Sequence, residues 1–428
     1  MKTQRFISIL LAALFVSMAL SVVGAQDKKV TVTWWHINTN QPEADYYQKV
    51  ADDYMAANPN VSIEITILEN QAFKDRLTTV MQAGDAPDLF QSWGGGVLWQ
   101  FADAGLVRDI APELKGEWGD SFSAQSALNL FKVKDATYGV PVTWGAVGMF
   151  YNKALFKKAG LDPEKPPATW AEFLDAVKTL KKADITPIAL GEQEKWPGHF
   201  WWVYLAMRIG GEDAFLKAYN REGGFSDETF VQAGEHLKEL IALDPFLPDY
   251  LALGYGQQSA AMGDGQAAME LMGHWSPGAQ TGNSTSKGAA LADEGWFPFP
   301  TVEGGKGGAT DVLGGGDGIA VGINAEDEAV DFLKYVTSAE VQKGAAAIWV
   351  VPVVKDCCND AIEASAFLPT ILAARDGAQY FQLYYDQFLP PAVGQAVNDN
   401  VESIFSGAAT PQEAAENIEA VAKSEMDE

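Results

Sequence analysis

The stretch Val61-Ser-Ile-Glu-Ile-Thr-Ile67 alternates apolar and polar side chains, which is typical of a β-strand with one buried face. The run Val30-Thr-Val-Thr-Trp34 alternates in the same way and predicts an earlier strand. Between them, Pro42 occupies a favourable first helical position, and apolar side chains recur at helical spacing until Asn58-Pro-Asn60. These segments predict a strand, a helix and a second strand in that order.

The alternation of helices and strands continues along the chain. A helix is predicted near residues 73–82, and a further short strand begins at residue 88. A strand–helix–strand–helix–strand order indicates a parallel sheet with right-handed crossovers. Farther on, Thr169-Trp-Ala-Glu172 is a capping box that marks the first turn of another helix. The chain is therefore predicted to have an α/β fold.

One pattern recurs three times where an apolar run ends. The copies are Asp88-Leu-Phe-Gln-Ser-Trp-Gly-Gly-Gly96, Ala268-Met-Glu-Leu-Met-Gly-His-Trp-Ser276 and Val312-Leu-Gly-Gly-Gly-Asp-Gly-Ile-Ala-Val321. In open α/β sheets the ligand crevice lies outside the carboxyl ends of the strands. Glycine there lets the backbone approach a ligand, and tryptophan offers a flat apolar face with one polar edge. The combination suits a sugar ring, although each copy alone is also typical of a turn beside a core tryptophan.

The first 25 residues have the organisation of a secretory signal peptide. Lys2 and Arg5 supply the positive start, residues 6–20 are apolar apart from two serines, and small residues precede a cleavage site before Gln26. The apolar run is short for a membrane span. Because residue 26 is not Cys, bacterial lipid attachment is not expected. We expect the mature protein to be exported, periplasmic and soluble.

Acidic residues outnumber basic ones in this chain. Its 428 residues include 57 Asp and Glu against 30 Lys and Arg, a formal charge of −27. Loss of Lys2 and Arg5 with the signal peptide leaves 28 basic residues and a formal charge of −29. Such a chain does not bind nucleic acid by general electrostatics. About 400 mature residues exceed the size of one hydrophobic core, so two domains are expected.

The sequence lacks the common signatures of catalysis and cofactor binding. Gly-Lys-Ser/Thr and Gly-x-Ser-x-Gly do not occur, and the glycine-rich tracts lack dinucleotide spacing. The four histidines lie far apart without metal-ligand spacing, so neither a metal nor a cofactor is expected. The adjacent Cys357 and Cys358 are expected to form a strained disulfide or to remain buried thiols, and we assign them no chemistry.

The chain resembles the extracellular solute-binding proteins of carbohydrate ABC importers, the large family that includes maltose-binding protein. The resemblance covers almost all of the mature chain. It is carried by Trp34-Trp-His36, Ala57-Asn-Pro-Asn-Val61, Gly84-Asp-Ala-Pro-Asp-Leu89, Tyr138-Gly-Val-Pro141, Phe150-Tyr-Asn-Lys153, Gly265-Gln-Ala-Ala-Met-Glu-Leu-Met-Gly-His-Trp275, Leu313-Gly-Gly-Gly-Asp-Gly318 and Gly322-Ile-Asn324. The segment ending in Trp275 is the most specific, since this residue matches a tryptophan that stacks on sugar in much of the family.

Shorter motifs resemble a subgroup that binds xylobiose and related oligosaccharides. They are Ser92-Trp-Gly-Gly-Gly96, Lys195-Trp-Pro197 and Gly314-Gly-Gly-Asp317. The resemblance implies a two-lobed periplasmic-binding-protein fold, in which each lobe is a mostly parallel sheet flanked by helices and the ligand cleft lies between the lobes. The predicted bounds are residues 26–142 and 318–368 for lobe 1, and residues 143–317 and 369–428 for lobe 2.

The candidate ligand-binding residues lie near the ends of predicted strands or in glycine-rich tracts. Trp275 and Trp93 can present ring faces to a cleft, and Asp317, set among glycines, can accept two hydroxyl hydrogen bonds. His36 and Asn38 are expected just past the first strand. The full set is Trp275, Trp93, Asp317, His36, Asn38, Glu69, Gln71, Ser92, Trp144, Trp196 and Gly315.

Some of these candidates have a second interpretation. Trp144 and Trp196 also suit packing between the lobes, where a tryptophan would serve stability and not ligand binding. Glu69 and Gln71 occupy the place after the second strand that His36 and Asn38 occupy after the first. Both positions are consistent with a ligand cleft.

We therefore expect a non-enzymatic protein that binds a neutral oligosaccharide, such as a xylo-oligosaccharide, and delivers it to the membrane permease subunits of an ABC importer. It is expected to be a monomer. Two alternatives stay open. One is an exported glycosidase, since acidic residues that could form a catalytic pair are plentiful. The other is a binding protein for a different solute, such as a polyamine.

Overall fold

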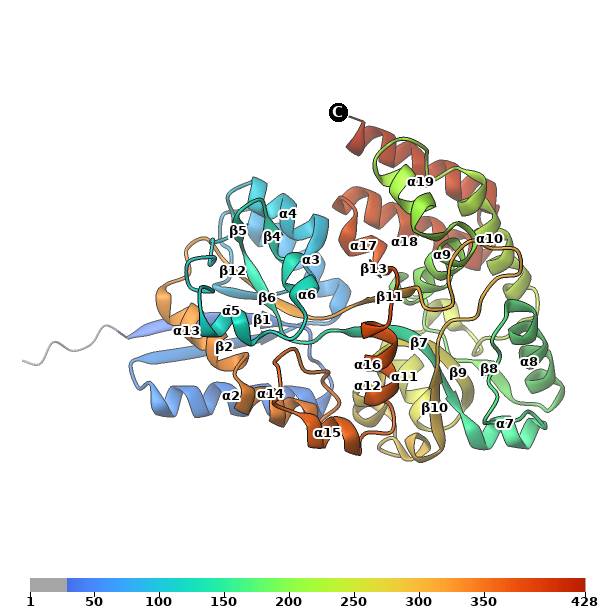
Figure 1. The fold of residues 1–428 in the computed structure, drawn as a ribbon, viewed down its shortest axis with the longest axis horizontal. Helices are drawn as coiled ribbons and strands as arrows, with labels where there is room; N and C mark the ends of the chain where they lie inside the picture. The colour runs from blue at the N-terminus through green and yellow to red at the C-terminus, as the bar shows by residue number, and fades with distance from the viewer. Residues whose placement is uncertain (1–28, 428) are drawn as a thin grey trace, which may run out of the picture.

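The computed structural model describes residues 29–427, and the predicted signal peptide lies outside them. The first of its two large sheets has the strand order β2 (Val61–Ile67), β1 (Val30–His36), β3 (Leu89–Ser92), β12 (Gly318–Val321) and β6 (Gly139–Pro141) (Figure 1). β1 pairs in parallel with β2 and with β3, whereas β12 runs antiparallel to both of its neighbours. Four of these five strands therefore point the same way, as predicted.

The second sheet has the strand order β13 (Phe381–Leu383), β11 (Val312–Gly315), β7 (Gly145–Asn152), β9 (Ala267–Gly273) and β8 (Thr186–Ile188), and β10 (Glu294–Phe297) also pairs with β7. β7 runs antiparallel to β9, β10 and β11, while β8 and β13 are parallel to their partners. In this sheet β7 alone, among the strands described, has the opposite direction. A small hairpin is formed by β4 (Lys132–Val133) and β5 (Ala136–Thr137).

The helices surround the two sheets (Figure 1). In chain order they are α2 (Gln41–Ala57), α3 (Asn70–Gln82), α4 (Gly95–Asp103), α5 (Glu117–Ser121), α6 (Gln125–Asn129), α7 (Lys153–Ala159), α8 (Trp170–Lys182), α9 (Trp196–Tyr219), α10 (Glu228–Ile241), α11 (Tyr255–Gly263), α12 (Ser276–Asn283), α13 (Asp327–Val336), α14 (Ala339–Ala346), α15 (Asn359–Ala364), α16 (Leu368–Asp376), α17 (Tyr385–Phe388), α18 (Pro391–Ser406) and α19 (Pro411–Met426). Short 3₁₀ helices lie at Tyr250–Ala252 and Ala289–Asp293. In the described part of the chain, none is long and apolar enough to cross a membrane.

The first sheet is buried on both faces. Trp34 faces α2 and α13, where its ring meets Tyr47 and Phe332 at centroid distances of 5.6 and 5.4 Å. The next residue, Trp35, packs on the opposite side with the cluster that contains Phe73 of α3. Alternate side chains of β1 thus enter separate cores, which is why α2 and α3 lie on opposite sides of the sheet (Figure 1).

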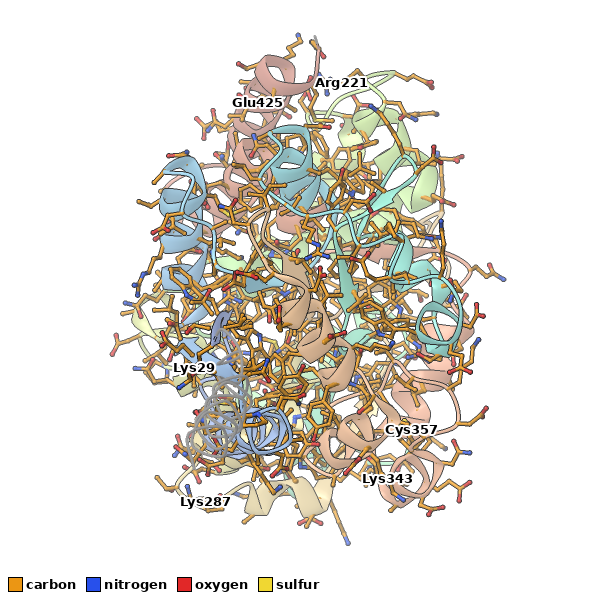
Figure 2. All side chains as sticks on the ribbon, turned by 90° about the vertical axis from the view of Figure 1, so that its left-hand side faces the viewer. Lys29, Arg221, Lys287, Lys343, Cys357 and Glu425 are labelled. Atoms are coloured by element: carbon orange, nitrogen blue, oxygen red, sulfur yellow. A yellow bond between two sulfur atoms is a disulfide. The ribbon has the colours of Figure 1, made fainter. Side chains whose placement is uncertain are left out.

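The second sheet packs against the long helix α9 and the C-terminal helices. Trp201 and Trp202 of α9 are almost fully buried in this core. At the end of the molecule where Figure 2 labels Arg221 and Glu425, the Arg221 guanidinium contacts Glu419 and Asp427, both at 2.6 Å. These ion pairs hold α19 against the loop that follows α9.

Two segments that connect the sheets run side by side. Residues 142–144 join β6 to β7, and Gly316 and Asp317 join β11 to β12. The backbone N–H groups of Val142 and Thr143 both donate to the Asp317 carbonyl, at 2.7 and 3.0 Å. A third connection runs between α15 and α16. These connections lie beside the predicted lobe boundaries, and the assignment of residues to lobes stays a prediction.

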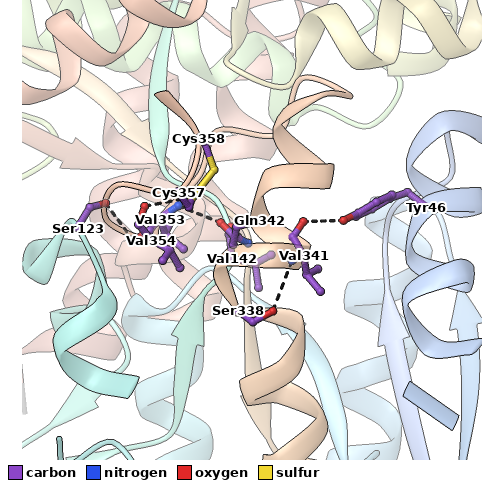
Figure 3. Close-up of a disulfide and its surroundings, with 10 residues drawn as sticks. All are labelled: Tyr46, Ser123, Val142, Ser338, Val341, Gln342, Val353, Val354, Cys357 and Cys358. Atoms are coloured by element: carbon purple, nitrogen blue, oxygen red, sulfur yellow. Dashed lines mark hydrogen bonds between the residues drawn. A yellow bond between two sulfur atoms is a disulfide. The ribbon is translucent and has the colours of Figure 1, made fainter. Parts of the chain in front are cut away.

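Cys357 and Cys358 form a disulfide, which is one of the two states expected for them (Figure 3). The segment before this disulfide is fixed by Gln342 of α14. The Gln342 amide donates to the Val142 carbonyl at 3.1 Å, and its oxygen accepts from the Val353 N–H at 3.0 Å. Through Gln342, the chain next to the disulfide is tied to a segment that connects the two sheets.

Candidate functional site

A cavity of about 340 Å³ lies between the two sheets. It forms where β1, β3 and β9 end, because Asn38, Trp93 and Trp275 follow these strands and all line the cavity. Ligands of open α/β folds bind at this edge of a sheet. The other lining side chains used below are Glu43, Glu69, Lys74, Asp317, Glu194, Trp196, His199, Tyr255, Tyr384 and Asp386.

Aromatic rings from the second sheet and its helices form one wall of the cavity. The Trp275 ring lies 6.4 Å from Trp196 and 6.1 Å from Tyr384, measured between centroids. Trp196 also meets Tyr255 at 5.0 Å. Trp275 lies directly over Gly273, where an added Cβ would come within 2.1 Å of the ring. Glycine at that position therefore allows the ring to fold back over the end of β9.

Trp93 faces the cavity from the first sheet. It follows β3, packs at 6.2 Å on Phe73, and has the Lys74 ammonium 5.2 Å from its ring centroid. Gly95 and Gly96 begin α4 directly behind it, and an added Cβ on Gly96 would lie 2.5 Å from the Leu389 carbonyl oxygen. The glycines thus let α4 approach α17, so that Trp93 stands opposite the aromatic wall of the second sheet.

Asp317 and Glu43 place two carboxyl groups at the base of the cavity. Burial raises the pKa of Asp317 to about 6. Burial also raises the pKa of Glu43 to about 7, a rise that the Asn40 side chain opposes and the charge of Asp317 reinforces. Both groups can accept hydrogen bonds from ligand hydroxyls, and charged acceptors form the stronger bonds. Neither carboxyl faces a basic side chain that would lower its pKa.

Lys74 and Asp386 form an ion pair that joins α3 to α17. The ammonium nitrogen lies 3.0 Å from an Asp386 carboxylate oxygen, and His199 lies 3.8 Å from the other oxygen. Although burial disfavours its charge, Asp386 has its pKa lowered to about 2 by Lys74 and His199. Lys74 is therefore neutralised by Asp386 and does not offset the remaining carboxylates of the cavity.

Glu69 and Glu194 face the cavity from opposite sides. Burial raises the pKa of Glu69, and the charge of Glu194 raises it further. Glu194 accepts a 2.8 Å hydrogen bond from the Trp196 indole N–H, which orients both side chains. With Glu43, Asp317 and the paired Asp386, the cavity has five carboxyl groups and one lysine among its lining residues. It is rich in hydrogen-bond acceptors that sit between aromatic faces.

Six of the eleven sequence candidates meet in this cavity: Asn38, Glu69, Trp93, Trp196, Trp275 and Asp317. His36 does not, because β1 continues past Trp34 and His36 is its last residue. Its side chain is 1 % exposed and packs on Trp34 at 4.8 Å, and burial lowers its pKa to about 4. The expectation that His36 follows the strand was wrong, because strand pairing with β2 extends to Ile67.

The other four candidates support the site or lie beside it. Trp144 stacks on Phe381 at 4.7 Å, which is the packing role that was its second interpretation. Gly315 leaves room for the Tyr384 ring, since its Cβ would lie 2.7 Å from that ring. The Ser92 hydroxyl accepts from the Gly94 N–H at 3.1 Å. Gln71 lies one helical turn from Asp75 and hydrogen-bonds to it at 3.0 Å.

Sequence reasoning missed seven of the cavity side chains described above: Glu43, Lys74, Glu194, His199, Tyr255, Tyr384 and Asp386. For Glu43 a signal existed, because Asn40 caps α2 and Glu43 is the acidic residue of its first turn. Tyr384 and Asp386 come from a part of the chain without strand or helix periodicity. Among the described residues, no group of three or more His, Cys, Asp or Glu is arranged to hold a metal ion.

The fold and this site define a class of protein, and comparison with known proteins agrees. The chain belongs to the family of bacterial extracellular solute-binding proteins, which matches residues 38–343. It is 26% identical over 349 residues to the multiple sugar-binding protein of Streptococcus mutans, covering 78% of this chain and 77% of that protein. It is 28% identical to the diacetylchitobiose binding protein of Streptomyces coelicolor, over 74% of this chain and 71% of that one.

Not every relative is matched over its full length. The chain spans about half of some curated relatives, such as 55% of an uncharacterized ABC transporter extracellular-binding protein of Pyrococcus horikoshii. Solved structures match more completely. A chitin oligosaccharide binding protein has a TM-score of 0.84 and 28% identity, with 94% of this chain and 100% of that chain covered. A structure from work on xylan utilization by Caldanaerobius polysaccharolyticus has a TM-score of 0.84 and 29% identity, covering 91% and 99% of the two chains.

Proposed function

We propose that the protein binds an uncharged oligosaccharide in the cavity between its lobes and delivers it to the permease of an ABC importer. One observation carries the proposal. Trp93 and Trp275 project into a single cavity from opposite sheets, together with the carboxyl groups of Asp317 and Glu43. Sugar rings have apolar C–H faces and a rim of hydroxyl donors, so aromatic faces and carboxylate acceptors complement them.

The relatives support the same function. Proteins named for multiple sugars, diacetylchitobiose and chitin oligosaccharides are similar to this chain over most of its length. On this basis we infer that the protein is exported and periplasmic, acts as a monomer and releases its ligand chemically unchanged. Lobe 1 at residues 26–142 and 318–368 and lobe 2 at residues 143–317 and 369–428 would close over the ligand by rotation about the connecting segments.

Calorimetric titration of the purified protein tests the proposal. The panel contains xylobiose, N,N′-diacetylchitobiose, maltose, raffinose and their longer homologues. We expect saturable binding of at least one of these sugars, and recovery of the intact sugar after incubation. Absence of binding across the panel contradicts the proposal. Conversion of the sugar into shorter products would instead establish a glycosidase.

Capture of a cationic solute is the second candidate function, and the acidic lining of the cavity favours it. Salt dependence separates the two. Sugar binding through stacking and hydrogen bonds should change little between about 0.01 M and 0.15 M salt, whereas long-range attraction of a polyamine is screened over this range. Tight, salt-sensitive spermidine binding without sugar binding would replace the oligosaccharide proposal.

A further inference from the structure

The ligand cleft continues beyond the 340 Å³ cavity into a second chamber of about 150 Å³. The chamber lies between α3, the junction of β3 with α4, and the helices α17 and α18. Four residues line both spaces: Lys74, Trp93, Asp386 and Gln387. These side chains therefore form the wall that separates the chamber from the main cavity.

The polar part of this wall is an ion pair between the two sides of the cleft. Lys74 extends from α3 and meets Asp386 of α17 at 3.0 Å. The Lys74 side chain is 22 % exposed and that of Asp386 is 6 % exposed, so the pair is largely shielded from solvent. The Lys74 ammonium also lies 5.2 Å from the ring centroid of Trp93, the third member of the wall. The pair thus lies on the wall between the two spaces, and a ligand that crosses the wall at this point must displace it.

The chamber is lined by a buried polar atom that lacks a protein partner, the amide oxygen of Asn398. Asn398 is 3 % exposed. Gln91 also lines the chamber and is 3 % exposed, but its side chain hydrogen-bonds to Asp317. A buried acceptor without a partner is costly, and native structures normally satisfy it with water or a ligand. A sugar hydroxyl donates a hydrogen bond, so it can satisfy this oxygen.

The volumes indicate how many sugar rings each space can take. A cavity of about 150 Å³ is known to accept benzene, a single six-membered ring. By this measure the chamber has the size of a single six-membered ring, and the main cavity, at about 340 Å³, is more than twice as large.

We propose that the chamber is an additional sugar-ring subsite and that the Lys74–Asp386 ion pair controls access to it, thereby setting the oligosaccharide length that the protein prefers. The inference rests on the proposed oligosaccharide function. In the closed protein with the pair formed, a disaccharide fills the main cavity. A third unit reaches Gln91 and Asn398 after Lys74 has moved away from Asp386.

Substitution of both charged residues tests this control. The double variant Lys74→Met/Asp386→Asn keeps similar side-chain lengths over Trp93 and leaves no unpaired charge. The readout is the ratio of the trisaccharide to the disaccharide association constant, measured by calorimetry with xylobiose and xylotriose and with the corresponding chitin, maltose and raffinose-series sugars. This ratio should rise at least about tenfold over wild type, as expected for removal of a largely buried charge pair from the path.

A matched control is the surface pair Lys49–Asp53 on α2. Lys49→Met/Asp53→Asn makes the same chemical change far from the cleft and should leave the ratio at its wild-type value. If the ratio in Lys74→Met/Asp386→Asn is unchanged or falls, the pair does not control ligand length and the inference is overturned. If the wild-type protein binds none of these sugars, the proposed function itself is refuted.

A crystal structure of the wild-type protein with a bound trisaccharide gives a second, independent test. We expect the third ring beside Gln91 and Asn398, with the Lys74 ammonium displaced from Asp386. A third ring that extends to solvent at another edge of the cavity, with only water in the chamber, would show that the chamber is not a subsite.

Discussion

Asp317 serves both the connection between the sheets and the ligand cavity. Its backbone carbonyl accepts two hydrogen bonds from Val142 and Thr143 in the neighbouring connection, while its side chain lines the cavity. A ligand bound to this carboxylate therefore contacts a residue of the segment about which the lobes would rotate. The same residue can transmit ligand contact to the hinge without an intermediate chain of side chains.

At the scale of single residues, replacing Trp275 should weaken sugar binding without unfolding the protein. Truncation of an anchoring tryptophan costs on the order of 2 kcal/mol or more, which is above tenfold in affinity. Calorimetry with the best sugar of the panel measures the loss for Trp275→Ala. Trp35→Ala is the control, because Trp35 lies outside the cavity and contacts Arg76. Equal sugar affinity of Trp275→Ala and wild type would show that Trp275 does not contribute to ligand binding.

Glu43 should make folding stability depend on pH between about 4.5 and 7. Its folded-state pKa is raised to about 7 from 4.5, so the folded protein holds a proton that the unfolded chain releases. The resulting stability is fully present below 4.5 and is lost as pH rises to about 7. Glu43→Gln removes this dependence. The unfolding free energy of the variant minus that of wild type should therefore increase by about 3 kcal/mol as pH rises from about 4.5 to 7.

Denaturant titrations of both proteins at several pH values measure this difference. The subtraction removes other pH-dependent groups, including the buried His36 and His274, whose lowered pKa values make stability rise with pH. A constant difference between Glu43→Gln and wild type would show that Glu43 is not buried in the folded protein.

At the scale of elements, the two connecting segments pack so closely that they require glycine. An added Cβ on Gly316 would lie 1.8 Å from the Thr143 carbonyl oxygen. Gly316→Ala must therefore push β6–β7 and β11–β12 apart, and overpacking of this kind costs about 1–3 kcal/mol. Chemical denaturation measures the loss of stability. The matched control is Gly256→Ala on α11, where nothing lies within 4 Å of the added Cβ and no loss is expected.

Elements with one buried face were predicted well from sequence. The Val61–Ile67 strand is found with the expected bounds, and the helix predicted from the capping box begins directly after Thr169 with that box formed. Val61 and Ile63 of the strand are buried and Glu64 is exposed, so the period of the pattern is visible even though the strand ends on an exposed Ile67. The predicted direction of the strands also follows from the order of strands and helices.

Helix α11 was not predicted, because its buried face mixes polar residues with Ala261 and Met262. Gln258 and Ser259 are fully buried there. Gln258 donates to Glu270 at 3.1 Å and accepts from the Gly191 N–H at 2.9 Å. Both partners lie outside the helix, 12 and 67 residues from Gln258, so the sequence of the helix alone does not show why these polar residues are buried. Asp386 was missed for a similar reason, since its partner Lys74 is 312 residues away.

At the scale of the whole molecule, ligand should make the protein more compact. The lobes are joined by narrow connections, and the cavity residues come from both sheets, so a ligand that contacts both sides favours the closed arrangement. Small-angle scattering should show a smaller radius of gyration with a saturating sugar than without it. An unchanged profile, with saturation shown by calorimetry on the same sample, would contradict hinge closure.

The order in which the strands appear along the chain also governs how the protein can fold during synthesis. β12 lies between β3 and β6 in the first sheet, yet it is made after all but one strand of the second sheet. A nascent chain that ends before residue 318 therefore leaves β3 and β6 unpaired on the sides that β12 will occupy. The first sheet therefore cannot be completed until about three quarters of the polypeptide has emerged from the ribosome, although domains generally fold from the N-terminus during synthesis. Such a delay suits the export that we propose, because translocation requires an unfolded chain.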